Sequence, residues 1–305
     1  MDDESYDDRL RAAAIAYVTA LDERNGGFVR EDELNTFEFE GQRIGLLQHM
    51  RGIRVVAELE AALTIRTTYR LRPEDRPYED DPGPEGLPRY KWRGMDADAY
   101  DNRALRRAMD LGKPVIWFRA IAPGIFQAVN PVWLIAEEAQ HQQFVLSVDA
   151  ALAVQWDHLL QHPEDEVLQR EYVEAVVKRR VHQPFFRQRV IAAYASQCAL
   201  CRLRHPPLLD AAHIREDGLG GEPIVPNGVA MCAIHHRAFD NWLLGIRPDH
   251  VIEIRRDVLD ESDGPTLQHA LQGLHASSLV LPEKKEAWPQ SDLLEERYER
   301  FKAAS

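Results

Sequence analysis

Apolar residues near the start of the chain recur with the period of a helix. Within residues 5–23 they would form one face of that helix, at Leu10, Ala13, Ile15, Val18 and Leu21. Asn25-Gly26-Gly27 follows directly, and these residue types end helices. The pattern predicts an N-terminal helix, followed by a short helix and an extended run over residues 26–46.

Strand-like runs replace this periodicity over about residues 43–149. Residues 58–71 favour a short helix and then a strand. Four more strands are predicted, at residues 113–121, 125–129, 131–139 and 142–149. Residues 150–184 return to a helical pattern, and the segment from about residue 264 predicts two further helices. The chain is therefore predicted to be α+β, with a strand-rich first part and a helical connector.

Length and charge change this picture in two ways. A chain of 305 residues is too long for one small domain and predicts two folded units. The formal charge of −13 disfavours nucleic acid as a partner on average, but residues 176–190 (VVKRRVHQPFFRQRV) are strongly basic. This stretch could contact phosphates, and the alternative is a solvated helical face.

Membrane and export signals are missing from the pattern. No apolar run is long enough to span a bilayer, and the acidic start MDDESYDDRL lacks the apolar core of a signal peptide. We expect a soluble, cytoplasmic protein with no membrane partner. Cysteines in that compartment stay reduced and are available for zinc.

All three cysteines fall in one window, C198-A-L-C201 … C232-A-I-H235-H236. Two ligands separated by two residues can reach one tetrahedral ion from a tight turn, and a second such pair completes a zinc site. Cys198, Cys201, Cys232 and His235 fit this demand and predict a structural Zn²⁺ site. The alternative is a set of buried free thiols.

The strings LLDAAHIRED and NGVAMCAIHHRAFD resemble the HNH nucleases of the ββα-metal fold, over about residues 185–255. The resemblance implies that His213 is the general base, that Asn227 shapes the loop between the strands, and that His236 binds a catalytic divalent metal such as Mg²⁺ or Mn²⁺. Phosphodiester hydrolysis needs a base that titrates near neutrality and a cation on the scissile phosphate.

One position departs from that family. Many members place a second metal ligand directly before the base, where this chain has Ala212. Asp210 would share the strand face of Ala212, and Asp240 would share the helix face of His236. Both acids are candidate ligands for the catalytic metal. Their alternatives are an acid at a strand end and a solvated acid on a helix.

Three further strings, PYEDD at 77–81, NRAL at 102–105 and GKPV at 112–115, resemble the SRA domain. That domain is a curved β-barrel related to the PUA fold, and it reads modified cytosine by flipping the base out of the duplex. The resemblance covers about residues 43–149. It implies a modified-base pocket built from Tyr78, Asp81 and Trp92, with Tyr90 as an alternative to Trp92.

These residue types suit an extruded base, because aromatic rings restore its stacking and a carboxylate accepts from the exocyclic amine. The alternatives are core aromatics and, for Asp81, an acid in a turn. Arg93 stands where the family has a small hydroxyl residue, which leaves the preferred C5 group open. Arg103, Arg106 and Arg107 most simply form a basic helix face.

Together these features predict residues 1–150 as an SRA-like domain with a helical extension to about residue 42, residues 151–184 as a helical linker, and residues 185–305 as an HNH domain with C-terminal helices. The combination resembles type IV-like restriction endonucleases that depend on DNA modification. We expect cleavage of double-stranded DNA carrying 5-methylcytosine or 5-hydroxymethylcytosine. One such site cuts one strand, so a homodimer is expected. The alternatives are a non-cleaving reader of modified DNA and an HNH nuclease for unmodified nucleic acid.

Overall fold

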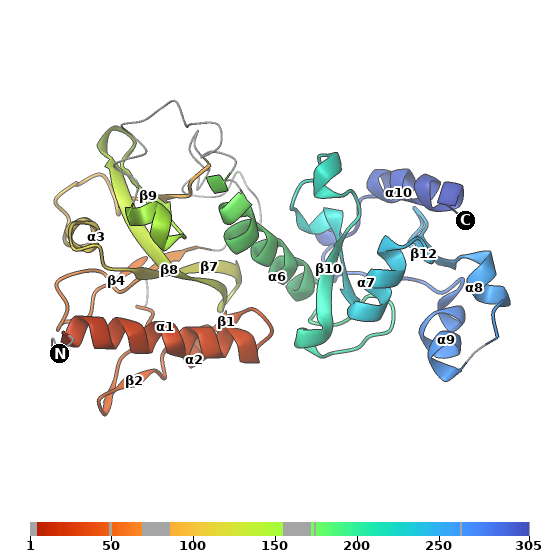
Figure 1. Ribbon diagram of the computed structural model, residues 1–305, viewed down its shortest axis with the longest axis horizontal. Coiled ribbons are helices and arrows are strands. Elements are labelled where there is room, and N and C mark those ends of the chain that lie inside the picture. The colour runs from red at the N-terminus through yellow and green to blue at the C-terminus, as the bar shows by residue number, and fades with distance from the viewer. Residues whose placement is uncertain are drawn as a thin grey trace. The chain divides into compact units, whose positions relative to one another are not determined.

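The computed structural model describes residues 5–48, 51–68, 86–154, 172–173, 175–262 and 264–304. The chain divides into two compact units, residues 1–184 and 185–305, and each is described by itself. The elements of both are labelled in Figure 1. Among the helices in these ranges, none combines the length and hydropathy that a bilayer-spanning segment needs.

A seven-stranded sheet that curls into a half-barrel is the centre of the first unit. Its strands follow the order β4 (Ile53–Arg54), β5 (Thr64–Thr67), β7 (Val115–Ala122), β8 (Ile125–Glu138), β9 (Gln143–Ser147) and β6 (Arg89–Lys91), and β1 (Val29–Arg30) also pairs with β8. Only β5 and β7 run parallel to each other among these pairs. The overall class is α+β.

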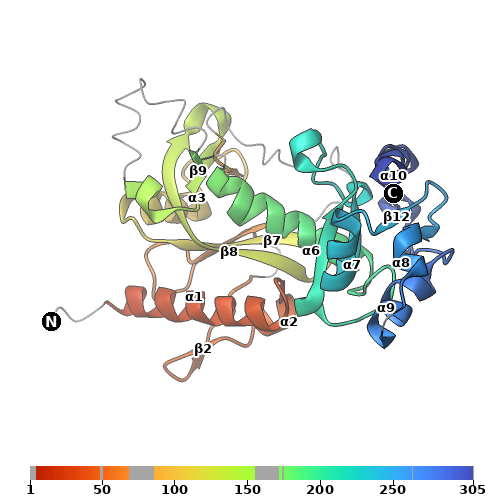
Figure 2. The same ribbon diagram turned by 45° about the vertical axis from the view of Figure 1, so that its right-hand side comes forward.

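Helices cover both faces of this sheet. Side chains alternate along β7, so Ile116 and Phe118 pack with α1 (Tyr6–Arg24), whereas Val115 and Trp117 pack with α3 (Tyr100–Asp110). Figures 1 and 2 show α1 and α3 on opposite sides of the sheet. Burial of both faces explains the nearly continuous apolar run of β7.

Smaller elements complete the first unit. They are α2 (Glu31–Leu34), the hairpin of β2 (Glu38–Phe39) and β3 (Gln42–Arg43), the 3₁₀ helix η2 (Ala139–His141) and the π-helix η4 (Lys178–His182). The helix predicted before β5 is absent, and residues 58–63 form turns, bends and irregular backbone instead. Most of the predicted linker, residues 155–171 and 174, lies outside the described residues.

The two strands predicted at 125–129 and 131–139 are one strand, β8. Asn130-Pro131 misled the prediction, because a proline usually marks the end of a strand. In the structure the pairing with β7 shifts register at this point, since Trp117 is opposite Val129 and Val115 is opposite Val132. The irregularity accommodates the proline without ending the strand.

The second unit begins within α6 (Gln183–Ala193) and is built around a hairpin and a helix. β10 (Leu209–His213) pairs antiparallel with β11 (Gly228–Cys232), and α7 (Ala233–Asp240) follows β11 directly. The later elements are β12 (Leu244–Ile246), β13 (Ile252–Ile254), α8 (Arg256–Asp260), α9 (Pro265–Ala270) and α10 (Ser291–Ala304). The 3₁₀ turns are η5 (Pro206–Leu208), η6 (Asp217–Leu219), η7 (Val225–Asn227), η8 (Gln272–Leu274) and η9 (Lys285–Ala287).

Two glycines show how closely helices approach this framework. A Cβ added at Gly228, the first residue of β11, would lie 2.5 Å from Val190 and 2.8 Å from Phe186 of α6. A Cβ at Gly245 of β12 would lie 2.6 Å from Phe301 of α10. The helices α6 and α10 are therefore packed directly against strands of the second unit.

Candidate zinc cluster and nuclease site

Three cysteines and a histidine meet at the junction of β11 and α7. The ligand atoms of Cys198, Cys201, Cys232 and His235 all lie within 4.8 Å of one another. The Nδ1 atom of His235 is 3.3 Å from the sulfur of Cys198 and 3.1 Å from that of Cys232, and the sulfurs of Cys201 and Cys232 are 4.0 Å apart. Ordinary zinc–ligand lengths in a tetrahedron require separations of about 3.6–3.8 Å. The donor set and its spacing fit zinc.

Local structure explains this gathering. The Cys198–Cys201 turn is held beside β11 by a hydrogen bond of 2.7 Å from the amide of Ala199 to the carbonyl of Ala230. Cys232 ends β11 and is the N-cap of α7, which places His235 in the first turn of the helix. The Nε2 atom of His235 is 2.7 Å from the carbonyl oxygen of Ala270, an acceptor that leaves Nδ1 for a metal.

His213 is the last residue of β10 and is half-buried. Its ring stacks on Phe186 of α6, with ring centroids 3.9 Å apart and planes 19° from parallel. This contact fixes the plane of the imidazole. The sequence pattern gave no role to Phe186, which lies in the basic stretch.

Asn227 fixes the connection between the two strands. It is 1% exposed, its side-chain oxygen accepts from the amide of Arg215, and its side-chain nitrogen donates to the carbonyls of Arg215 and Glu222. The contacts reach the chain two residues after His213 and do not involve the His213 ring. Asn227 therefore closes the loop that begins at His213.

His236 lies between two carboxylates. Its Nδ1 is 3.1 Å from Asp210 of β10, and its Nε2 is 3.3 Å from Asp240, one turn further along α7. The Asp210 hydrogen bond raises the pKa of His236 above its ordinary value, although burial opposes this. Burial also disfavours ionisation of Asp210, but its hydrogen bonds to His236 and to the Ala211 amide outweigh burial and lower its pKa.

Each carboxylate also has an arginine beside it. Arg187 of α6 is 3.4 Å from Asp210, and Arg297 of α10 is 3.6 Å from Asp240. We call this arrangement the charged row, and its members in order are Arg187, Asp210, His236, Asp240 and Arg297. The two carboxylates lie at different nitrogens of one ring, so a single ion on His236 could share only one of them. Ala212 is fully buried and offers no ligand atom.

The structure describes only two of the four residues predicted for the modified-base pocket. Tyr78 and Asp81 lie outside the described residues. Tyr90 and Trp92 are 7% and 6% exposed and belong to the core beneath α3. The hydroxyl of Tyr90 donates to the carbonyl of Gly52 at 3.0 Å.

The predicted basic face of α3 is largely neutralised by neighbouring groups. Arg106 pairs with Glu137, Arg107 pairs with Glu60, and Arg103 donates to the carbonyl of Asp98.

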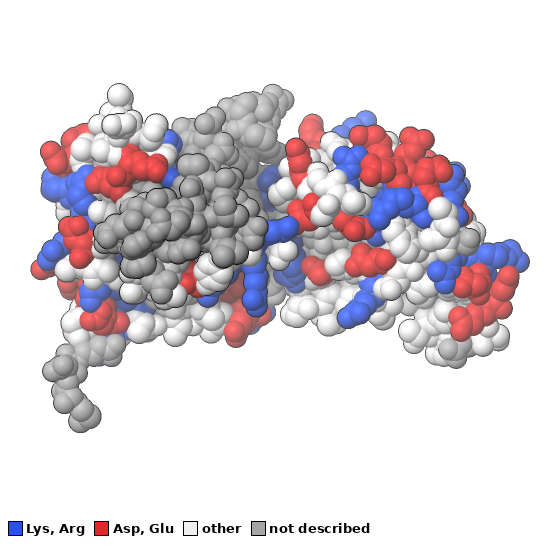
Figure 3. Space-filling view, turned by 45° about the horizontal axis from the view of Figure 1, so that its top comes forward, with Lys and Arg blue, Asp and Glu red and all other residues white. Residues whose placement is uncertain are grey.

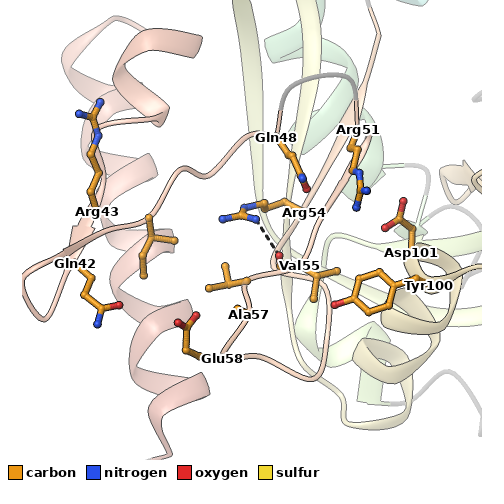
Figure 4. Close-up of a pocket in the computed structure, with 12 residues that line it drawn as sticks. Gln42, Arg43, Gln48, Arg51, Arg54, Val55, Ala57, Glu58, Tyr100 and Asp101 are labelled. Carbon is orange, nitrogen blue, oxygen red and sulfur yellow. Dashed lines mark hydrogen bonds between the residues drawn. The ribbon is translucent and has the colours of Figure 1, made fainter.

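A pocket of about 400 Å³ opens in the first unit between residues 42–58 and the start of α3 (Figure 4). The guanidinium of Arg54 is held by the carbonyls of Gly45 and Val55. That of Arg51 has no hydrogen bond or ion pair within the described ranges. Tyr100, whose ring borders the pocket, is 57% exposed.

Acidic and basic side chains are interspersed on the face of the molecule shown in Figure 3. Among the described residues of the second unit, exposed pairs include Arg215 with Glu296, Arg300 with Glu216 and Arg256 with Asp260. The described residues on this face therefore do not form one continuous acidic surface.

The family model of HNH endonucleases matches residues 198–247. This range contains the cysteine–histidine cluster, β10, β11 and α7. Residues 198–247 form an HNH endonuclease domain. The HNH domain also includes Asp210, His213, Asn227, His236 and Asp240, whereas Arg187 and Arg297 lie outside it.

No curated protein matches the chain. A solved structure titled "Modification dependent TagI restriction endonuclease" is similar, with 17% identity and a TM-score of 0.28, over 83% of this chain and 86% of that chain.

Proposed function

We propose that the chain is a metal-dependent DNA endonuclease whose HNH domain hydrolyses phosphodiester bonds. The observation that carries this proposal is the arrangement within that domain. His213 ends one strand of the hairpin, and His236 lies on the following helix beside two carboxylates. A base and a metal-binding imidazole on one small scaffold are the groups that such hydrolysis requires.

His213 accepts the proton of the attacking water, and its stacking on Phe186 holds the ring in one plane during that transfer. Asn227 keeps the following loop closed and so fixes the end of β10. His236 and either Asp210 or Asp240 would hold the divalent ion. When bound, that ion supplies charge stabilisation for the scissile phosphate and its leaving oxygen.

Zinc in the cysteine–histidine cluster is structural in this proposal. All four protein ligands are used there, which leaves no open position for substrate. The cluster joins the Cys198–Cys201 turn to the start of α7. His236 is thereby held next to β10.

We propose modified cytosine in double-stranded DNA as the substrate, with the first unit as its reader. Support comes from the SRA-like strings in the sequence and from the curled sheet of the first unit. Tyr78 and Asp81 would contact the extruded base. Trp92 or Tyr90 would contribute a second ring, and each must become more exposed to do so, because both are interior here. A homodimer would supply one site for each DNA strand.

Cleavage of one plasmid in three forms tests the proposal. Unmodified, 5-methylcytosine and 5-hydroxymethylcytosine copies are incubated with the full chain and Mg²⁺ or Mn²⁺. We expect cleavage of the modified forms and loss of cleavage in His213→Ala. Equal rates on all three would end the case for a modified-base reader.

A non-cleaving reader is the second candidate, because Ala212 gives no ligand where many HNH nucleases have one. Supercoiled DNA that persists over a range of metals, together with tighter binding to modified DNA, would favour this candidate.

A further inference from the structure

Arg297 is a buried arginine that lies outside the HNH domain in sequence. It belongs to α10, near the C-terminus, and is 4% exposed. Its guanidinium carbon lies 3.9 Å from the ring centroid of Phe239 and 4.7 Å from that of Trp242. A charge at this depth requires partners, because its desolvation is unfavourable. The partners of Arg297 therefore indicate its role.

Those partners come from both sides of the hairpin-and-helix framework. Arg297 donates to the carbonyl of Ile214 at 3.3 Å, directly after His213, and to the carbonyl of Phe239 at 3.2 Å, near the end of α7. The same guanidinium lies 3.4 Å from the carboxylate of Glu216 and 3.6 Å from that of Asp240. One planar group thus spans the end of β10 and the end of α7.

The contact with Asp240 extends to the nuclease site. One oxygen of Asp240 faces Arg297 and the other lies 3.3 Å from Nε2 of His236. The ammonium group of a lysine is a point charge on a flexible stem, whereas the planar guanidinium of an arginine binds several acceptors in a fixed geometry. Loss of this fork would release the Asp240 carboxylate while leaving His236 in place on its helix.

We propose that Arg297 is a positioning residue of the nuclease site. It acts through Asp240, whose other carboxylate oxygen faces His236, to orient that ring. This inference rests on the proposed endonuclease function. The inference makes α10 part of the nuclease site, although in this proposal α10 contributes no group that contacts DNA or metal.

The test uses the full chain and the variant Arg297→Lys, which keeps the charge and removes the fork. Arg300→Met is the matched control. Arg300 lies on the same helix and over the same Trp242 ring at 5.0 Å. Both arginines lie near Glu216, at 3.3 Å and 3.4 Å, so this control disturbs the Glu216 contact and leaves the contact of Arg297 with Asp240. Zinc content and circular dichroism establish that both variants are folded.

Plasmid cleavage is measured over a range of Mn²⁺ concentrations. Arg297→Lys is expected to lower kcat about tenfold with little change in KM for DNA, and Arg300→Met to stay within about twofold of the parent. Combining Arg297→Lys with Asp240→Asn should lower kcat no further than Asp240→Asn alone. If the double variant instead lowers kcat by the product of the two separate effects, the positioning role is wrong.

A second measurement does not depend on cleavage. Mn²⁺ is titrated while paramagnetic broadening of the His236 ring signals is followed by NMR. Arg297→Lys and Asp240→Asn are each expected to raise the midpoint about tenfold. If the parent cleaves no DNA but these shifts occur, the endonuclease proposal fails and the positioning role stands. If DNA is cleaved and both midpoints equal that of the parent, the positioning role is wrong.

Discussion

Adjacent histidines at the start of α7 should respond oppositely to substitution. His235 is 1% exposed and faces the cysteine cluster, whereas the side chain of His236 is 24% exposed and faces Asp210 and Asp240. Consecutive helical residues differ by about 100° in direction, which explains how neighbours serve two sites. We therefore expect His235→Ala to unfold the second unit and His236→Ala to leave it folded.

The expected magnitudes follow from these surroundings. Binding of a structural zinc ion contributes about 10–16 kcal/mol at neutral pH, comparable to or larger than the net stability of about 5–15 kcal/mol for a whole domain. Loss of one of four ligands removes enough of that free energy to exceed the margin. His236→Ala removes a half-buried imidazole, its hydrogen bond to Asp210 and its contact with Asp240, and both carboxylates remain partly solvated, a cost of about 1–2 kcal/mol.

Zinc content by elemental analysis and urea unfolding by circular dichroism measure both variants. His235→Ala should lose zinc and the unfolding transition of the second unit, and His236→Ala should keep both and lose cleavage. Full zinc content in His235→Ala would refute the assignment of His235 to the cluster. Zinc loss in His236→Ala would refute the separation of the two sites.

Three further predictions concern the loop, the packing and the DNA contact. Asn227→Ala should destabilise the second unit by about 1–3 kcal/mol in urea unfolding, because buried backbone groups lose their partners; unchanged stability would contradict its role in the loop. Gly228→Ala should cost about 1–3 kcal/mol through its contact with α6, whereas Gly218→Ala, with open space around it, should be nearly neutral; equal effects would be inconsistent with close packing at Gly228. Arg51→Ala should weaken DNA binding equally for all sequences and reduce the salt slope of log K by about 1, as fluorescence anisotropy at several salt concentrations can measure; an unchanged slope would exclude a phosphate contact.

The cysteine–histidine cluster was predictable because its geometry is mostly local. Each ligand pair lies within a turn, and the spacing alone brings two donors to one point. The ranges of α1, β7 and β9 also follow from the apolar pattern, since each packs one or both faces against a core. Asn130-Pro131 was misread because the register shift that accommodates it depends on β7, a different segment.

Contacts between distant segments could not be predicted. Arg187 and Arg297 contact Asp210 and Asp240 from helices at the two ends of the second unit. Each arginine belongs to a run of charged residues, which is the pattern of a solvated surface. Similarly, Tyr90 and Trp92 have the residue types of a stacking site and equally those of a core. Only the path of the chain places them in the interior.

The charged row has a consequence for the order in which ligands arrive. With His236 neutral, the charges of Arg187 and Arg297 cancel those of Asp210 and Asp240, so the five groups together carry no net charge. A site without net charge attracts the negative phosphodiester only weakly. A divalent cation on His236 would change the sum to +2, and the site would then attract DNA. Metal first and DNA second is the sequence of binding that this balance favours.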